Sequence, residues 1–322
     1  MPPPLPGIHH VTAICGDPQR NIDFYTGALG LRLVKQTVNF DDPERYHLYY
    51  GDARGTPGSL ITFFAWPGAR GGQRGLGQFT VASFAVPTRS LGYWVERLVA
   101  RGIPYEHPRK RFGEQVLAFR DPDGLPLEIV ASSRPLPDGL RWGDVPAEHA
   151  IRRLHAVELW EHEGAGTTRF LADRLGFRRV EASGNRRRYA VGDARPGTYI
   201  DVVDATGLWS GTVAVGTIHH VAWRTADDGQ QAEWREHLVS HEVQVSPVRD
   251  RQYFRSIYFE EPGGALFEIA TDIPGFAVDE PIATLGTRLC LPPQYESRRA
   301  HLEATLPTLR LPALHLPQDS RG

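Results

Sequence analysis

Two short stretches decide the fold: GIHHVTAI, from Gly7 to Ile14, and its echo TIHHVAWR, from Thr217 to Arg224. Each sets two adjacent histidines among apolar and β-branched residues, which is typical of a strand. Successive side chains on a strand point to opposite faces, so we expect the two histidines of each pair to face opposite ways. The return of the pair far along the chain indicates an internal repeat.

Around these stretches the sequence repeats one pattern four times. In the first unit a strand over 8–14 precedes a helix over 18–31, and strand-like runs follow at 32–40, 45–52 and 58–66. The later units open with strands at 78–87, 153–161 and 217–225, and each continues with an amphipathic stretch and strand-like runs bounded by turn residues. The order is βαβββ in each unit.

This repeat predicts the fold class and the domains. A four-stranded sheet buries one face against its helix and needs a partner for the other, so two units facing each other make a cup. We therefore expect an α+β protein of four βαβββ modules that form two cup-shaped half-barrels. The Pro- and Gly-rich segment in the middle predicts the following division: an N-terminal domain over 1–131, a linker over 132–149, a C-terminal domain over 150–272 and a Pro-rich tail over 273–322.

Alternation sorts the residues that line the cups from those that pack on the helices. The Val after each histidine pair fits the helix face, which places His10 and His220 on the cup-lining face. Aligning the other first strands gives Thr80 and Ala156 at the same position. The last strand of each unit has a central residue between apolar neighbours, and these central residues should also face a cup: Thr62, Glu128, Asp201 and Glu268.

The pairing of units decides which of these side chains meet. Units one and two together offer only His10 and Glu128 as good ligands, whereas units three and four offer His220, Asp201 and Glu268. Units one and four bring together His10, His220 and Glu268, two imidazoles and a carboxylate with positions left for water. That set is typical of non-haem Fe(II) oxygenases. We favour one with four and two with three, which leaves the second cup without metal and its two carboxylates paired with arginines.

Composition narrows the class of protein. The chain has 322 residues, 41% of them hydrophobic, and a formal net charge of −2, so nothing calls for a nucleic acid or a membrane surface. Cys15 and Cys290 are the only cysteines, which argues against a disulfide framework and predicts buried thiols. The first residues lack the basic region and apolar run of a signal peptide. We expect a cytoplasmic protein.

Several motifs resemble a known family. IHHVT, IHHVAW and PGGALFEIAT look like the vicinal oxygen chelate superfamily, which includes glyoxalase, bleomycin resistance and dioxygenase proteins. The segments YHLYYGDARGTPGSLITFF, DRQYFRSIYFEEPGGALFE and LPPQYESRRAHLEATLP are similar to hydroquinone ring-cleaving dioxygenases of the chlorohydroquinone 1,2-dioxygenase type. The resemblance extends over nearly the whole chain.

The resemblance implies an iron site and a substrate. It implies Fe(II) held by His10, His220 and Glu268, the set that alternation selects, with another divalent metal able to replace iron in a crystal. A small dihydroxylated aromatic and O2 would react there, in extradiol-type ring cleavage that serves aromatic compound degradation. The resemblance also implies roles beside the metal for five residues: His9, Thr12, His219, Arg251 and Tyr258. Thr12 shares the parity of His10, whereas His9 and His219 should point away, and their reading as structural core histidines stays open.

Two rival functions remain. A glyoxalase-I-like metal-dependent lyase would use four protein ligands, two of them carboxylates, and Thr62 at the fourth position argues against it. A non-catalytic small-molecule-binding protein of the superfamily would lack the metal triad. The residues leave open the natural substrate, its substituents and whether the chain forms a homo-oligomer.

Overall fold

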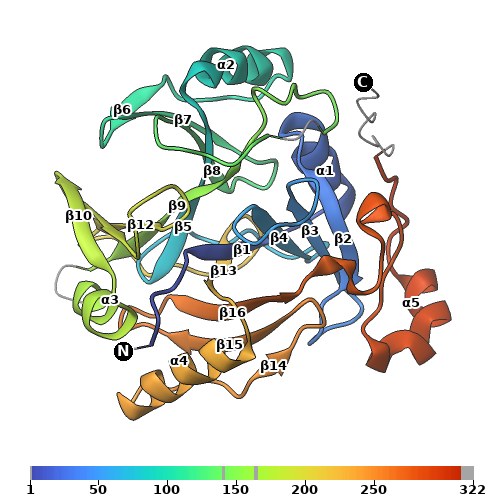
Figure 1. Cartoon of the computed structure of the whole chain (residues 1–322). Helices are drawn as coiled ribbons and strands as arrows, with labels where there is room; N and C mark the ends of the chain where they lie inside the picture. The colour runs from blue at the N-terminus through green and yellow to red at the C-terminus, as the bar shows by residue number, and fades with distance from the viewer. Residues whose placement is uncertain (1, 140–141, 163–165, 313–322) are drawn as a thin grey trace, which may run out of the picture.

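The structure is a computed structural model, and it describes residues 2–139, 142–162 and 166–312. The end of the predicted tail and two residues of the predicted linker lie outside the described residues. Figure 1 shows two strongly curled sheets with helices on their outer sides. The expected α+β architecture of half-barrels is confirmed.

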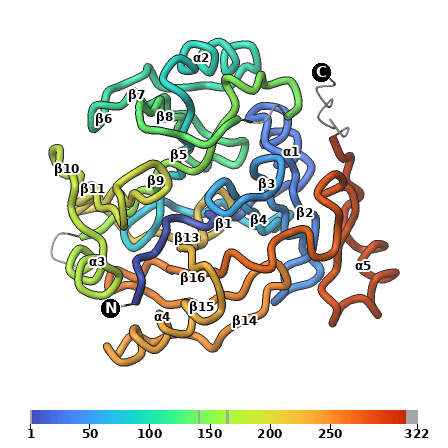
Figure 2. Tube along the Cα trace, in the orientation of Figure 1, coloured from blue at the N-terminus to red at the C-terminus, as the bar shows by residue number. Residues whose placement is uncertain are grey.

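The first sheet joins the first and the fourth units. Its eight strands run in the order β14-β15-β16-β13-β1-β4-β3-β2. From the first unit come β1 (Ile8–Cys15), β2 (Arg32–Val38), β3 (Tyr46–Gly51) and β4 (Leu60–Ala65). From the fourth come β13 (Ile218–Thr225), β14 (Arg249–Asp250), β15 (Phe254–Glu260) and β16 (Leu266–Pro274). At the junction β1 pairs with β13 antiparallel, so segments from opposite ends of the chain lie side by side (Figure 2).

The second sheet joins the second and the third units in the order β10-β11-β12-β9-β5-β8-β7-β6. The second unit supplies β5 (Gln78–Pro87), β6 (Arg109–Arg111), β7 (Glu114–Arg120) and β8 (Pro126–Ser132). The third supplies β9 (Arg153–Glu161), β10 (Arg178–Ser183), β11 (Arg186–Ala190) and β12 (Tyr199–Asp204). The strands β6, β10 and β14 carry largely exposed, polar residues and lie at sheet edges, which is why the apolar pattern did not reveal them.

The helices cover the outer faces of the sheets. They are α1 (Pro18–Ile22), which continues through a wider helical segment over Asp23–Ala28, α2 (Leu91–Ala100), α3 (Thr167–Leu175) and α4 (Asp228–Ser240). Asp17 and Asp227 cap the starts of α1 and α4 by accepting a backbone hydrogen bond. Val11 and Val221 are fully buried in the core under these helices, as alternation predicts. No described helix is both long and apolar enough to cross a membrane.

The tail packs against the first sheet. After β16 it forms three short 3₁₀ turns, at Phe276–Val278, Ile282–Thr284 and Pro293–Arg298, and then α5 (Arg299–Thr305). Phe276 and Leu285 are buried in a cluster with Tyr49 and Phe254. The start of the tail therefore helps to fill the inner side of the first sheet.

Both histidine pairs lie on β-bulges at the junction of the first sheet. Ile8 faces Trp223 and His10 faces Ala222, so His9 is an extra residue in β1. On the other strand Ile218 faces Ala13 and His220 faces Thr12, which makes His219 the extra residue of β13. A bulge breaks the alternation of faces at the inserted residue.

Candidate metal centre

Three side chains from opposite ends of the chain converge inside the first sheet. His10 on β1, His220 on β13 and Glu268 on β16 each offer one ligand atom, and these atoms lie within 4.8 Å of one another. Oε2 of Glu268 lies 3.4 Å from Nε2 of His10 and 2.8 Å from Nε2 of His220. The exposed fractions of the three are only 2%, 4% and 0%. The structure therefore brings together the three residues that the sequence predicts as ligands, although their metal-binding role stays a prediction.

The surroundings of Glu268 fit a cation. Ser256 donates a hydrogen bond to Oε1, whereas the fully buried Oε2 accepts no well-aligned hydrogen bond. Burial alone would raise the pKa of Glu268, but the neighbouring His10 and His220 outweigh it and hold that pKa well below its ordinary value. Burial is the main reason why the pKa of His220 is lowered. The site thus favours an ionised Glu268 beside a neutral His220, the protonation states in which a carboxylate and an imidazole bind a metal.

His9 and His219, the outer histidine of each pair, do not point away from the cup, so this expectation is wrong. Nδ1 of His9 lies 2.9 Å from Nδ1 of His10, and Nδ1 of His219 lies 2.8 Å from Nδ1 of His220. Ile8 and Val11 both pack in the outer core, so the two residues between them share the inner side. The bulges are the physical cause, since each turns the inserted histidine toward its neighbour.

Each outer histidine fixes the ring of an inner one. A hydrogen bond between the Nδ1 atoms leaves Nε2 of His10 and of His220 directed at Glu268. Such contacts set the tautomer and orientation of a metal-ligating imidazole. The pKa of His9 lies well below its ordinary value, mainly because the ring is buried, and burial likewise lowers the pKa of His219 to about 3. Both rings are therefore neutral, and Nδ1 of each can accept a hydrogen bond from the N–H of the inner ring.

A further histidine lies in the same cup and was missed from the sequence. Nε2 of His47 on β3 is 2.9 Å from the hydroxyl of Thr62, which is 2.8 Å from the hydroxyl of Thr12. The hydroxyl of Tyr49 bonds Nδ1 of His47 at 3.0 Å. Burial lowers the pKa of His47 well below its usual value, and the site histidines add to this effect. Thr12 thus faces the cup as its parity predicts, but its direct partner is Thr62.

Tyr258 and Arg251 border the ligand group on the β15 side. The Tyr258 ring lies 5.7 Å from that of His220, and Nε of Arg251 donates to the Tyr258 hydroxyl at 3.3 Å. A second hydrogen bond, to Asp41 at 3.0 Å, holds the guanidinium from the other side. The pKa of Tyr258 is raised, first by burial and then by Glu268, which outweigh Arg251. A neutral phenol and a positive charge therefore stand beside the predicted ligands.

Among the described residues, the second sheet contains no equivalent ligand group. By strand register Ala156 takes the place of His220, as aligned from sequence, but Val81 rather than Thr80 takes the place of His10, because Thr80 is itself the extra residue of a bulge. Arg111 binds Glu128 through two hydrogen bonds, and Arg188 does the same for Asp201. The predicted arginine pairing of these two carboxylates is confirmed.

One other cluster in the described part of the chain has the residue types of a metal site. Asp279, Glu280 and Cys290 lie close together, but the ammonium of the fully buried Lys35 bonds both carboxylates and lies 3.8 Å from the sulfur. A lysine thus supplies the positive charge there. Cys15 and Cys290 are both free and buried, as predicted.

Comparisons with known proteins identify the family of this chain. The model of the Glyoxalase/Bleomycin resistance protein/Dioxygenase superfamily matches residues 7–129 and 153–269. The chain is 48% identical to "Putative ring-cleaving dioxygenase MhqO" of Bacillus subtilis, over 93% of this chain and 95% of that protein. It is 33% identical to "Chlorohydroquinone/hydroquinone 1,2-dioxygenase" of Sphingobium indicum, over 95% of this chain and 97% of that protein.

Solved structures give the same result. A crystal structure described as a "putative dioxygenase" from Bacillus subtilis superposes with a TM-score of 0.91 at 46% identity, covering 97% of this chain and 99% of that one. Glyoxalase I from Zea mays superposes with a TM-score of 0.62 at 16% identity, covering 83% of this chain and 92% of that one, which shows a shared fold alone. The chain belongs to the Glyoxalase/Bleomycin resistance protein/Dioxygenase superfamily.

Proposed function

We propose that this member of the superfamily is a non-haem Fe(II)-dependent dioxygenase that opens a hydroquinone-type aromatic ring with O2, in the extradiol manner. The observation that carries the proposal is the convergence of His10, His220 and Glu268 on one buried point. Relatives whose names state ring cleavage, one of them a hydroquinone dioxygenase, support it over nearly the full length of the chain.

The three residues would hold Fe(II) through two imidazole nitrogens and one carboxylate oxygen. When bound, Fe(II) would supply coordination sites for a diol oxygen and for O2, and it would lower the pKa of the bound phenol. His9 and His219 keep the inner rings in the tautomer that leaves Nε2 free of a proton. All three ligands are buried, so they would hold the metal away from bulk solvent.

The neighbouring polar groups would handle protons and charge. A para-diol reaches a metal through one oxygen only, so its second hydroxyl needs protein partners. His47, Tyr258 and Arg251 lie around the ligand group, and a neutral imidazole or phenol there can accept or donate a proton at that hydroxyl. Arg251 can stabilise the negative charge that develops as the ring opens.

Thr62 distinguishes this function from a glyoxalase-type reaction. The lyase would need a second carboxylate at the equivalent of Glu268 in the first unit. Thr62 occupies that position, and its hydroxyl is already bonded to Thr12 and His47. A three-ligand site with open positions therefore fits an oxygenase better than a four-ligand lyase.

Product analysis tests the proposal. Protein loaded with Fe(II) without air should convert hydroquinone to a ring-opened acid that carries both atoms of labelled O2, measured by mass spectrometry. Glu268→Gln should lose this product while keeping the fold, and Glu296→Gln, on an exposed turn of the tail, serves as the matched control. Isomerisation of a glutathione hemithioacetal in place of ring opening would instead establish the glyoxalase-type reaction.

A further inference from the structure

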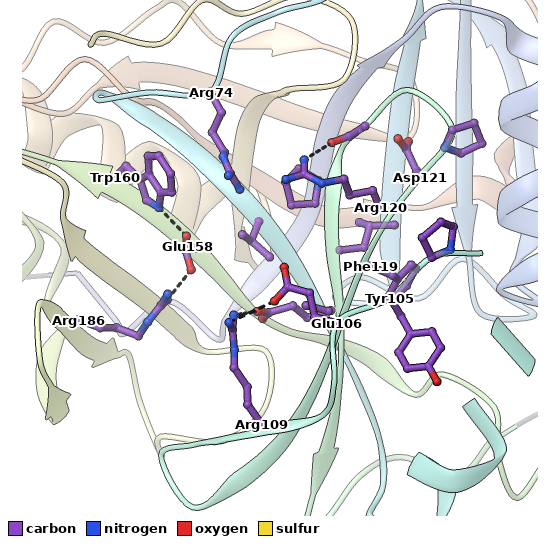
Figure 3. Close-up of a pocket in the computed structure, with 18 residues that line it drawn as sticks. Arg74, Tyr105, Glu106, Arg109, Phe119, Arg120, Asp121, Glu158, Trp160 and Arg186 are labelled. Carbon is purple, nitrogen blue, oxygen red and sulfur yellow. Dashed lines mark hydrogen bonds and ion pairs between the residues drawn. The ribbon is translucent and has the colours of Figure 1, made fainter. Parts of the chain in front are cut away.

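The second half-barrel encloses a cavity of about 610 Å³ although its metal-ligand positions are lost. Figure 3 shows this hollow between β5, β7, β8 and β9 with side chains directed into it from several strands. Its walls combine apolar groups, including Val81, Phe119 and Leu127, with Tyr105 and Trp160. Phe119 and Leu127 are almost fully buried, so the surface that the cavity offers to a ring comes from the partly exposed Tyr105 and Trp160. A single aromatic ring with one or two substituents fits such a volume.

The carboxylates that line this cavity all have partners within the chain. The ion pairs are Glu106 with Arg109 at 3.3 Å, Glu128 with Arg111, and Glu158 with Arg186 at 2.5 Å. Asp121 is turned to the Tyr25 hydroxyl at 3.1 Å and to the backbone N–H of Leu125 at 2.8 Å. Each lining carboxylate therefore already has an ion-pair or hydrogen-bond partner within the chain.

Two arginines of the lining are not compensated in this way. Among the residues that the structure describes, neither Arg74 nor Arg120 forms an ion pair with a carboxylate. The Arg74 guanidinium lies over the indole of Trp160, 4.5 Å from its centre, and Arg120 donates only to the backbone carbonyl of Gly124 at 2.9 Å. Figure 3 shows Arg74 pointing into the hollow beside Trp160. Burial lowers the pKa of Arg74 most and the nearby Arg120 lowers it further, whereas Glu158 and Glu106, which already pair with Arg186 and Arg109, raise it by less.

We propose that this cavity binds a small aromatic carboxylate, with its ring against Tyr105 and Trp160 and its carboxylate between Arg74 and Arg120. Guanidinium groups bind carboxylates through paired hydrogen bonds, and an apolar wall beside them selects an organic acid over an inorganic anion. The indole of Trp160 is held in place because its Nε1 donates a hydrogen bond to Glu158 at 2.5 Å. The inference is independent of the proposed reaction, since this cavity lies in the second sheet and the candidate metal centre in the first.

Calorimetric titration with 4-hydroxybenzoate tests the assignment. The intact protein should bind one equivalent per chain, and Arg74→Gln or Arg120→Gln should each weaken binding about tenfold or more, the usual loss for a hydrogen bond to a charged group. Arg74→Lys should recover part of the affinity because it keeps the charge. Arg89→Gln, on an exposed turn away from the cavity, is the matched control and should bind as the intact protein does.

Two further measurements separate this site from the metal centre. The neutral 4-hydroxybenzyl alcohol should bind more weakly than 4-hydroxybenzoate. Its affinity should be the same for the intact protein and for Arg74→Gln. His220→Ala, with its fold checked by thermal melting, should still bind 4-hydroxybenzoate. Loss of binding in His220→Ala with full binding in both arginine variants would move the ligand to the metal centre and overturn the inference. The absence of any binding at millimolar concentration would also overturn it.

Discussion

The contact between His9 and His10 predicts how much an outer histidine contributes to metal binding. For Nε2 of His10 to bind a metal, the ring proton must be on Nδ1. This N–H then donates a hydrogen bond to Nδ1 of His9, 2.9 Å away. His9→Phe keeps a ring against Phe254 but removes the acceptor. The buried N–H is then left without a partner, at a cost of about 1–3 kcal/mol. Since about 1.4 kcal/mol is a factor of ten, the metal Kd should rise roughly 10- to 100-fold.

Titration of metal-free protein with Mn(II), followed by calorimetry, measures this Kd without oxidation of the metal. His9→Asn should restore much of the affinity because its side-chain oxygen can accept from His10. His241→Phe is the control for the loss of a histidine as such, because His241 is an exposed residue at the end of α4. A Kd for His9→Phe within about twofold of the unaltered protein would refute the orienting role of His9.

Three other perturbations have defined outcomes. Tyr258→Phe should leave metal content unchanged and lower kcat on hydroquinone on the order of a hundredfold, because the phenol held by Arg251 is removed; an unchanged kcat would reject its part in proton transfer. Glu161 is buried beside Glu261, and burial raises its pKa to about 8, so the free energy of unfolding should fall as the pH rises from about 4.5 to about 8; Glu161→Gln should flatten this profile in thermal melts. Lys35→Met leaves Asp279 and Glu280 without their cation and should cost about 3–5 kcal/mol in urea unfolding, whereas a loss below about 1 kcal/mol would show that the pair is dispensable.

The ligand group could be predicted because parity and repetition are local properties of the sequence. Val11 and Val221 mark the helix side, and Glu268 stands between two apolar neighbours that are both in the core. The same reasoning identified Glu128 as a carboxylate in need of a cation, which Arg111 supplies.

The bulges could not be derived from alternation alone, since register depends on the partner strand. A signal was nevertheless present. Ile8 and Val11 are both apolar and three residues apart, which a regular strand with one buried face does not allow. His47 was missed, although its place between the core residues Tyr46 and Leu48 indicates that it faces the cup.

Contacts between residues far apart in the sequence account for the rest. The edge strands β6, β10 and β14 form because neighbouring strands offer hydrogen-bond partners, not because of their own pattern. The tail was expected only as a Pro-rich segment, yet Phe276 and Leu285 pack inside the first sheet. The ion pairs of Lys35 with this segment join residues that no local pattern connects.

Oxygen uptake tests the central claim most directly. The claim is that the first and last units of the repeat assemble one iron site that cleaves a diol ring. With Fe(II) loaded anaerobically to one equivalent per chain, hydroquinone should drive the consumption of one O2 per ring opened, and His220→Ala should consume none. An iron-loaded protein that takes up no oxygen with either hydroquinone or catechol would contradict the account.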